Sequence, residues 1–188
     1  MKAYIFLATG YEEAEAVDVA DILERGGMDI DFVSIDNSDW VKGSRGFTLK
    51  ADVPFSGTDF TDGDVFFIPG GIPGAPTLAA FKPLGEVLKQ ADQDGKTIAA
   101  ICAGPIVLKS FGLVEDRTVT SHSSVRDRFD PRYYDADHSV VRSSNIFTGK
   151  GLGAALELGL TLVSCLLSSE KANQISLAIE NGPFQTSL

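Results

Sequence analysis

The stretch Thr97-Ile98-Ala99-Ala100-Ile101-Cys102-Ala103-Gly104-Pro105 decides how the rest of the sequence is interpreted. An apolar run leads into a turn of small residues, and a helical pattern begins directly after it. A short, continuously apolar run is typical of a strand that is buried on both faces of a sheet. The stretch therefore predicts a central strand, a tight turn that carries one cysteine, and a helix.

Predicted strands and helices alternate along the rest of the chain as well. Apolar spacing predicts strands over 4–8, 28–35, 65–68, 97–101 and 118–121, short strands within 132–148, and helices over 12–25, 84–92, 104–111 and 152–167. It also predicts an edge hairpin over 40–54, a helical turn over 123–128 and a partly helical tail from residue 169. This pattern favours an α/β fold with a mostly parallel sheet covered by helices on both faces. We expect one domain over residues 1–188, because 188 residues with 44% hydrophobic content can form one full core.

Composition argues against several classes of partner. A formal net charge of -10 disfavours nucleic acid and anionic membrane, which both require clustered Lys and Arg. The first residues lack the pattern of a signal peptide, and no apolar stretch is long enough to span a bilayer, so we expect a cytoplasmic protein. The two cysteines form neither a disulfide framework nor a zinc motif, and we expect no metal or other cofactor.

Polar features follow four of the predicted strands. They are Glu12 to Glu15, the glycine-rich loop after Ile68, Cys102, and His122. Ligands of open parallel sheets bind at the carboxyl ends of the strands, where such loops converge. We therefore expect these features to form one site.

Cys102 has two interpretations. It can pack in the core, since cysteine is among the most buried residue types. It can instead be a reactive thiol, because a turn of small residues exposes its side chain and a helix N-terminus lowers the pKa of a thiol. Cys165, beside the apolar stripe of the last long helix, is predicted to fill the core.

The acidic residues and histidines also leave alternatives open. Glu13 is predicted to be a solvated helix cap, whereas Glu15 lies at the border of the buried stripe and could share a proton with a neighbouring thiol. Glu15 could equally be another solvated cap. His122 is either a general acid/base or a hydrogen-bonded residue at a strand end, and His138 is predicted to be solvated.

Two glycine-rich segments complete the candidates. The Gly70-Gly71 loop and the amide after Cys102 could offer N–H groups to an oxyanion, or the loop is an ordinary tight turn. The segment 149–153 lacks the spacing of a dinucleotide fingerprint, so nucleotide binding is disfavoured.

The chain resembles the ThiJ/PfpI superfamily, and within it the branch related to the Parkinson-disease-associated deglycase. The motifs that carry the resemblance extend over almost the whole chain: Gly10-Tyr11-Glu12-Glu13-Ala14-Glu15, Ile68-Pro69-Gly70-Gly71, Ala99-Ala100-Ile101-Cys102-Ala103-Gly104-Pro105, Val119-Thr120-Ser121-His122 and Thr148-Gly149-Lys150-Gly151-Leu152-Gly153.

This resemblance implies a flavodoxin-like three-layer sandwich, a homodimer and a cysteine-dependent site. Cys102 would be the nucleophile at a strained elbow, Glu15 the protonated carboxyl bonded to its sulfur, and His122 the nearby histidine. The amides of Gly71 and Ala103 would serve the oxyanion, while Gly70 and Lys150 would line the rim. The implied functions are glutathione-independent glyoxalase or protein deglycase activity on small aldehydes, and alternatively oxidation sensing through a cysteine sulfinate.

The chain departs from the superfamily's patterns at two places. Ala103 follows the cysteine where the peptidase-like branch has histidine, which disfavours peptidase activity. The segment 148–153 lacks the serine and proline of the T-S-x-G-P-G pattern that is common in the favoured branch, which bears on the pocket rim and on substrate preference.

Overall fold

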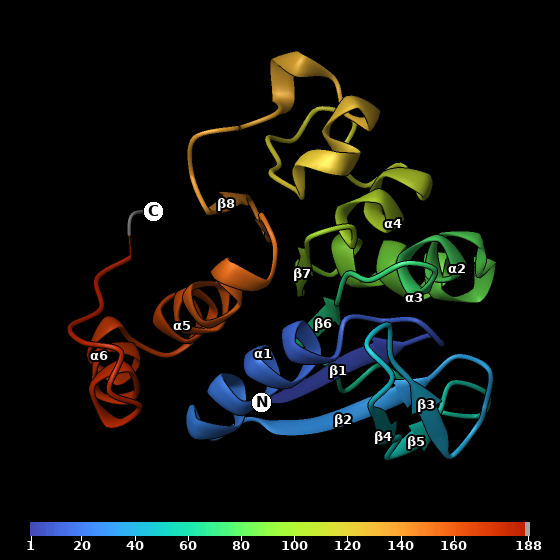
Figure 1. Cartoon of the computed structure of the whole chain (residues 1–188), viewed down its shortest axis with the longest axis horizontal. Helices are drawn as coiled ribbons and strands as arrows, with labels where there is room; N and C mark the ends of the chain where they lie inside the picture. The colour runs from blue at the N-terminus through green and yellow to red at the C-terminus, as the bar shows by residue number, and fades with distance from the viewer. Residues whose placement is uncertain (187–188) are drawn as a thin grey trace.

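A computed structural model describes residues 1–186, and a seven-stranded sheet forms its centre (Figure 1). The strand order is β5-β2-β1-β6-β7-β9-β8. The strands are β1 (Lys2–Leu7), β2 (Asp29–Ser34), β5 (Val53–Pro54), β6 (Val65–Ile68), β7 (Thr97–Ile101), β8 (Val140–Ser143) and β9 (Ile146–Gly149). All neighbouring strands pair in parallel except β8 and β9, which form an antiparallel pair at one edge.

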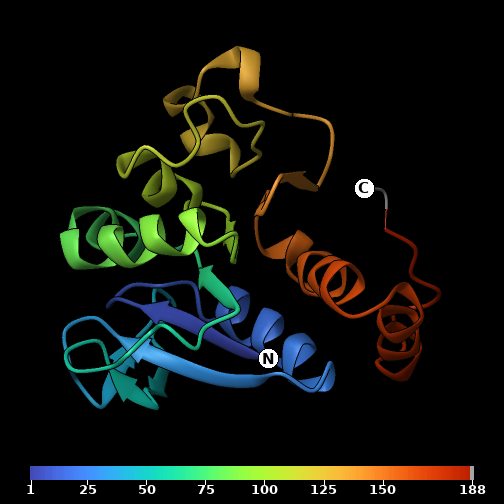
Figure 2. The ribbon, with the colours of Figure 1, turned by 180° about the vertical axis from the view of Figure 1, so that it is seen from behind.

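Helices cover both faces of this sheet, as the reverse view in Figure 2 also shows. One face packs against α1 (Glu13–Arg25) and α5 (Ala155–Leu166), with α6 (Ser169–Ala178) beside α5. The other face packs against α2 (Gly74–Ala80), α3 (Lys82–Gln93) and α4 (Pro105–Ser110). The predicted three-layer α/β sandwich with a mostly parallel sheet is confirmed.

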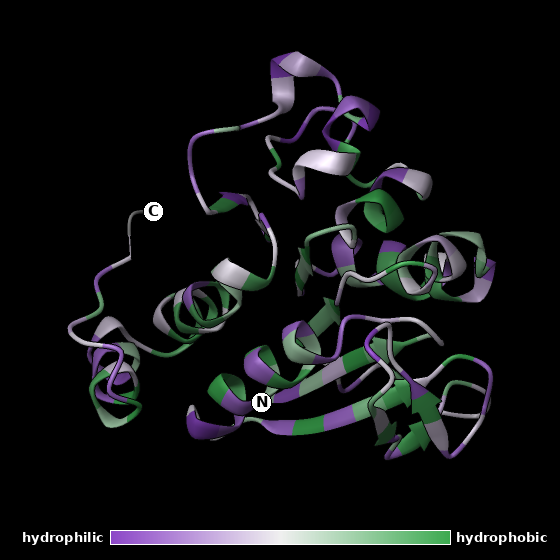
Figure 3. Cartoon of the chain, in the orientation of Figure 1, coloured by the Kyte–Doolittle hydropathy of each residue, from purple (hydrophilic) through white to green (hydrophobic). Residues whose placement is uncertain are grey.

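Hydropathy explains which parts of the chain enter the layers (Figure 3). Every residue of β6 and β7 is buried, because helices cover both faces of these strands. Figure 3 shows mixed polar and apolar colours along α1 and α5, as expected for helices with one face on a core. Among the described residues, no helix has the length and apolar character needed to cross a membrane.

The strand order also fixes where a site can form. From β1 the chain moves outward to β2 and β5, and it then returns to β6 on the other side of β1. Such a reversal of strand order opens a crevice at the carboxyl ends of the strands on either side. The loops after β1, β6 and β7 therefore converge at one end of the sheet.

Two local predictions differ from the structure. Residues 118–121 form no strand, because Val119 makes only an isolated bridge with Tyr134. The loop after β6 continues into α2, a helix of seven residues that the sequence analysis missed. The predicted hairpin is present as β3 (Trp40–Lys42) and β4 (Thr48–Lys50), which form a separate two-stranded sheet. Three short 3-10 helices, η1 (Ser123–Arg128), η2 (Pro131–Tyr133) and η3 (Leu152–Ala154), complete the fold.

Candidate active site

Cys102 stands directly after β7, between the sheet and the start of α4. Its backbone has a φ of 61°, in the left-handed region that non-glycine residues rarely adopt. Two backbone hydrogen bonds hold this conformation: the Cys102 amide donates to the Gly149 carbonyl, and the His122 amide donates to the Cys102 carbonyl, both at 2.9 Å. The neighbouring segments thus fix the direction in which the half-buried thiol points.

Glu15, in the first turn of α1, reaches the same place from the other side of the crevice. It is only 1% exposed, and its carboxyl group forms a hydrogen bond with the Cys102 thiol. The Gly70 amide donates to Glu15 Oε2 at 2.9 Å, and the Leu152 amide also donates to this carboxylate. The structure therefore joins two of the predicted site residues that lie 87 positions apart in the sequence.

The carboxyl and the thiol influence each other's protonation. Burial raises the pKa of Glu15 to about 7. Burial also raises the pKa of Cys102 to about 12, with the negative charge of Glu15 as the next cause. The prediction that the helix N-terminus lowers the pKa of the Cys102 thiol is therefore wrong. Desolvation and the nearby carboxylate raise this pKa by more than the amides at the sulfur lower it. The pair holds one proton over the pH range between these values.

Backbone amides of two loops surround the sulfur. Both the Gly71 amide and the Ala103 amide donate hydrogen bonds to the Cys102 sulfur. Gly70 lets these loops approach closely, since a Cβ at this position would lie 2.6 Å from both Cys102 Cβ and Glu15 Oε2. These N–H groups can stabilise negative charge on the sulfur or on an atom bonded to it.

His122 and Lys150 line the same pocket but are more loosely connected to the thiol. The His122 ring is exposed, and its Nδ1 interacts with Ser124 Oγ at 2.8 Å and with the Ser124 amide at 3.2 Å. Within residues 1–186, the ring forms no hydrogen bond with Cys102 or Glu15. The Lys150 ammonium donates to the carbonyls of Ala136 and Asp137, so it secures the rim of the pocket to the segment before β8.

The pocket itself is open and has a volume of about 560 Å³. Its lining also includes Glu12 and Leu152, which belong to predicted features of the site, and two residues that the sequence analysis missed, Arg45 and Ser139. Arg45 Nε lies 3.4 Å from Glu12 Oε2, which places a guanidinium at the mouth. Among residues 1–186, no group of three or more His, Cys, Asp or Glu side chains could hold a metal ion.

Comparison with known families agrees with this arrangement. The family model described as DJ-1/PfpI matches residues 1–165. The chain belongs to the DJ-1/PfpI family. The resemblance found in the sequence is thereby confirmed.

Relatives within the DJ-1/PfpI family cover most of the chain. Glutathione-independent glyoxalase DJR-1.2 of Caenorhabditis elegans is 37% identical over 165 residues, which are 87% of each protein. Protein DJ-1 homolog B of Arabidopsis thaliana is 35% identical over 178 residues, 93% of this chain but only 40% of the plant protein. The oxidized DJ-1 structure of Toxoplasma gondii superposes with a TM-score of 0.91 at 33% identity, covering 95% of this chain and 97% of the other.

In this DJ-1/PfpI protein, the prediction that Glu13 is a solvated helix cap is wrong. Glu13 is 7% exposed, and its carboxylate accepts hydrogen bonds from the amides of Arg45 at 2.8 Å and Phe47 at 3.1 Å. The Ser44 hydroxyl donates to it as well. Glu13 therefore anchors the turn between β3 and β4, which carries Arg45 to the pocket. The side chain points toward this turn, which the sequence spacing on α1 could not indicate.

Cys165 is half-buried, so the prediction that it fills the core is wrong in part. It packs against the cluster formed by α1 and α5, but it also lies on a surface hollow beside Arg142, whose Nη1 is 3.7 Å from the sulfur. His138 is exposed as predicted and pairs with Asp135.

Proposed function

We propose that this chain is a cysteine-dependent, glutathione-independent glyoxalase that needs no cofactor. It would convert methylglyoxal or a related 2-oxoaldehyde to the 2-hydroxy acid. The observation that carries the proposal is the hydrogen-bonded pair of Cys102 and Glu15 at the base of an open pocket. A nucleophile in contact with a group whose pKa is close to 7 is suited to a reaction that both adds to a carbonyl and moves a proton.

The reaction begins when Glu15 accepts the thiol proton. The thiolate of Cys102 adds to the aldehyde carbon, and the new oxyanion takes the proton back from Glu15, which gives a hemithioacetal and restores the carboxylate. The amides of Gly71 and Ala103 lie beside the sulfur, where they can stabilise this oxyanion.

The second stage moves hydrogen between the two carbons. Glu15, as a carboxylate, removes the proton from the former aldehyde carbon to give an enediolate, and a proton then returns to the neighbouring carbon. The first carbon is oxidised and the second reduced, so no external oxidant is consumed. Water hydrolyses the resulting thioester, which releases lactate from methylglyoxal and restores the thiol.

We assign His122 as a second proton carrier at the mouth of the pocket. Its Nδ1 accepts from the Ser124 amide, so the neutral ring carries its proton on Nε2. The open pocket also leaves room for adducts of 2-oxoaldehydes with amines, which extends the proposal to deglycase activity. The residue directly after Cys102 is Ala103 and not a histidine, so peptidase activity is disfavoured.

Lactate production from methylglyoxal without glutathione tests this function. We expect turnover by the wild-type chain and by Cys165→Ser, and none by Cys102→Ser. Glu15→Gln should lose most of kcat, since general acid/base catalysis contributes roughly 10²- to 10⁴-fold. Equal lactate formation by wild type and Cys102→Ser would contradict the proposal, provided that both variants show the same circular dichroism spectrum.

A second candidate function is oxidation sensing at Cys102. The specific observation is that two amides and the Glu15 carboxyl already face the sulfur, so they can donate to the oxygens of a sulfinate. Two equivalents of peroxide would convert the thiolate to the sulfinate and release two waters. Intact mass after mild peroxide should show two added oxygens on Cys102, whereas equal oxidation of Cys165 and the methionines would contradict this role.

We further propose that the active form is a homodimer. Phe47 is 73% exposed and Val17 is 42% exposed, and both lie close to Glu13 on the outer side of α1. Exposed apolar groups of this kind favour association. Light scattering after gel filtration should give twice the 20.0 kDa chain mass, and Phe47→Ser should shift it toward the monomer. An unchanged mass for Phe47→Ser would exclude this surface.

A further inference from the structure

A second cavity lies at the opposite end of the sheet from Cys102. It has a volume of about 340 Å³ and is formed by α3, the segment between β5 and β6, and Lys96 just before β7. Cys102 follows the other end of β7, so the five residues of the strand separate the two places by roughly 17 Å at about 3.3 Å per residue. The cavity therefore belongs to neither the thiol site nor the proposed reaction.

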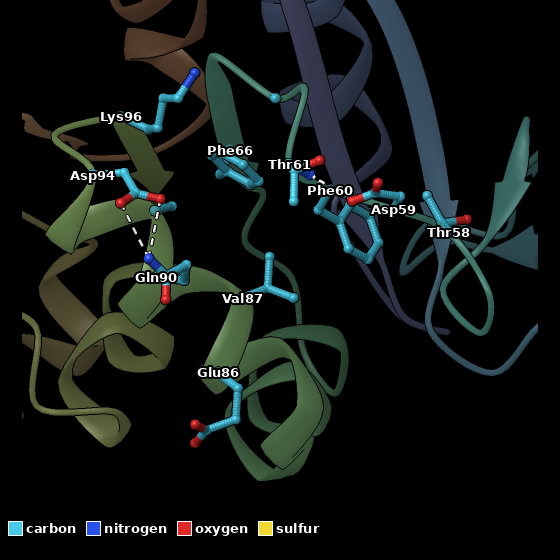
Figure 4. Close-up of a pocket in the computed structure, with 12 residues that line it drawn as sticks. Thr58, Asp59, Phe60, Thr61, Phe66, Glu86, Val87, Gln90, Asp94 and Lys96 are labelled. Atoms are coloured by element: carbon cyan, nitrogen blue, oxygen red, sulfur yellow. Dashed lines mark hydrogen bonds between the residues drawn. The ribbon is translucent and has the colours of Figure 1, made fainter.

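Two aromatic rings and two aliphatic side chains form its apolar part. Figure 4 shows Phe60 and Phe66 on adjacent sides of the cavity, with Val87 of α3 between them. Gly63 allows the Phe66 ring to lie against the backbone, because a Cβ there would be 2.5 Å from Phe66 Cζ. Ala91 completes this apolar lining.

The aromatic walls are preformed. The Phe60 ring packs edge-on against Tyr4 and in a tilted contact against Phe55, with centroids 5.0 Å apart in both pairs. Tyr4 also holds the backbone of the segment, since its hydroxyl donates to Asp62 Oδ1 at 2.6 Å and lies 3.2 Å from the Asp59 carbonyl oxygen. A ligand would not need to order this wall when it binds.

The rim carries an excess of negative charge. In the described part of the chain, three carboxylates line the cavity, those of Asp59, Glu86 and Asp94, against one cation, Lys96. Lys96 Nζ pairs with Asp64 at 3.3 Å, and in Figure 4 its side chain points away from the Phe66 ring. Among residues 1–186, the donor to Asp94 is a neutral one, Gln90 Nε2, at 3.1 Å to each oxygen. The charge of Asp94 is therefore not balanced by this contact.

Apolar rings beside uncompensated carboxylates select a definite chemical class. The face of an aromatic ring attracts cations, most strongly those with a weakly hydrated charge such as alkylated ammonium groups. The volume lies within the range of small-molecule sites. We infer that this cavity binds a small organic cation, an aryl or alkyl ammonium whose apolar body packs between Phe60, Phe66 and Val87 and whose charge reaches a carboxylate at one end of the cavity, Asp59 or Asp94, which Figure 4 shows on opposite sides.

Benzyltrimethylammonium is the probe, with benzyl alcohol and phenylacetate as its neutral and anionic counterparts. Titration followed by amide chemical shifts should give saturable changes within 58–66 and 86–96, and none at Cys102 or within 149–153. We expect binding about tenfold tighter for the cation than for benzyl alcohol, the size expected of a cation–π contact with nearby carboxylates. Equal binding of the two, or no saturable shift for the cation, would overturn the inference.

Matched variants separate this site from a general effect of charge. Asp59→Asn/Asp94→Asn keeps the acceptor oxygens for Thr61 and Gln90 but removes two charges, so it should weaken the cation about tenfold and leave benzyl alcohol unchanged. Asp116→Asn/Asp127→Asn changes the net charge equally at exposed positions elsewhere and should bind like wild type. Equal weakening in both double variants would show that net charge alone attracts the probe. Cys102→Ser should bind normally, so failure of the proposed enzyme function would leave this result intact.

Discussion

At the scale of single residues, the chemistry depends on one proton shared by Glu15 and Cys102. Burial raises the pKa of both groups. The Glu15 carboxylate raises the pKa of Cys102 further, whereas the hydrogen bond from the Cys102 thiol lowers the pKa of Glu15. The first proton leaves the pair as the pH rises through about 7, and the second leaves near 12. The reactive one-proton state is thus absent in acid and present at neutral and moderately alkaline pH.

The rate of Cys102 alkylation by iodoacetamide should report this coupling. In a Cys165→Ser background, we expect a rise near pH 7 and a second rise in strong alkali. Adding Glu15→Gln should leave a single rise between the two, because one acceptor of the first proton is gone and no carboxylate charge opposes the thiolate. Identical profiles with and without Glu15 would show that the carboxyl does not exchange its proton with the sulfur.

Gly70 sets the distance between these two groups. Gly70→Ala places a methyl group 2.6 Å from Cys102 Cβ and Glu15 Oε2, so we expect a loss of about 1–3 kcal/mol in unfolding free energy together with a loss of lactate formation. Gly153→Ala, where a Cβ meets nothing within 4 Å, is the matched control in the same pocket and should change neither. Urea unfolding and lactate assays on both variants measure the difference.

At the scale of elements, the hairpin β3–β4 depends on a carboxylate of α1. Glu13→Gln can keep Oε1 for the Arg45 and Phe47 amides, but it puts a donor group in place of Oε2, which accepts from the Arg45 amide at 3.1 Å and from the Ser44 hydroxyl at 3.3 Å. We expect a loss of about 1–3 kcal/mol in unfolding free energy, the cost of an unsatisfied buried group. Glu24→Gln, on the exposed side of the same helix, should be within about 0.5 kcal/mol of wild type. Similar unfolding midpoints for the two variants would contradict this role of Glu13.

The elements also show which parts of the fold the sequence can predict. Strands such as β6 and β7 are continuous apolar runs, and their burial on both faces leaves a clear pattern. The helix α2 has no recognisable sequence pattern, because it has only seven residues and these include Gly74 and Pro76. The run 118–121 has strand propensity through its three β-branched residues, yet within the described chain only Val119 finds a bridge partner, Tyr134. Propensity is a local property, whereas pairing is decided by the whole fold.

The candidate site was predictable to the extent that topology determines it. Cys102, Glu15 and Gly71 each follow a strand of a parallel sheet, so their convergence follows from the strand order. Arg45 comes from a hairpin outside the main sheet, and no pattern in the sequence shows which way that hairpin folds. The sequence also could not predict the raised pKa of Cys102, because this pKa depends on how deeply the side chains of Cys102 and Glu15 are buried together.

At the scale of the whole molecule, one ion pair connects three distant segments. Arg117 donates to both oxygens of Asp92 at the end of α3, at 2.7 and 3.0 Å, and Asn145 Nδ2 between β8 and β9 donates to Asp92 as well. We expect Arg117→Lys to lower the unfolding free energy by about 1–3 kcal/mol, because lysine cannot make the two parallel bonds. Arg128→Lys, at an exposed position, is the control. Equal urea midpoints for the two would show that the two parallel bonds of Arg117 contribute nothing beyond a single charge contact.

The left-handed backbone of Cys102 has a consequence for the order of stabilities among its variants. At most positions alanine is better tolerated than glycine, but at a φ of 61° the Cβ of alanine is unfavourable and glycine is not. Cys102→Gly should therefore have a free energy of unfolding about 1 kcal/mol higher than that of Cys102→Ala, and it should unfold at a higher urea concentration. The rest of the protein must therefore be stable enough to hold Cys102 in a backbone conformation that an unconstrained cysteine would not adopt. A chain weakened elsewhere would be expected to lose the geometry of its thiol before it loses its fold.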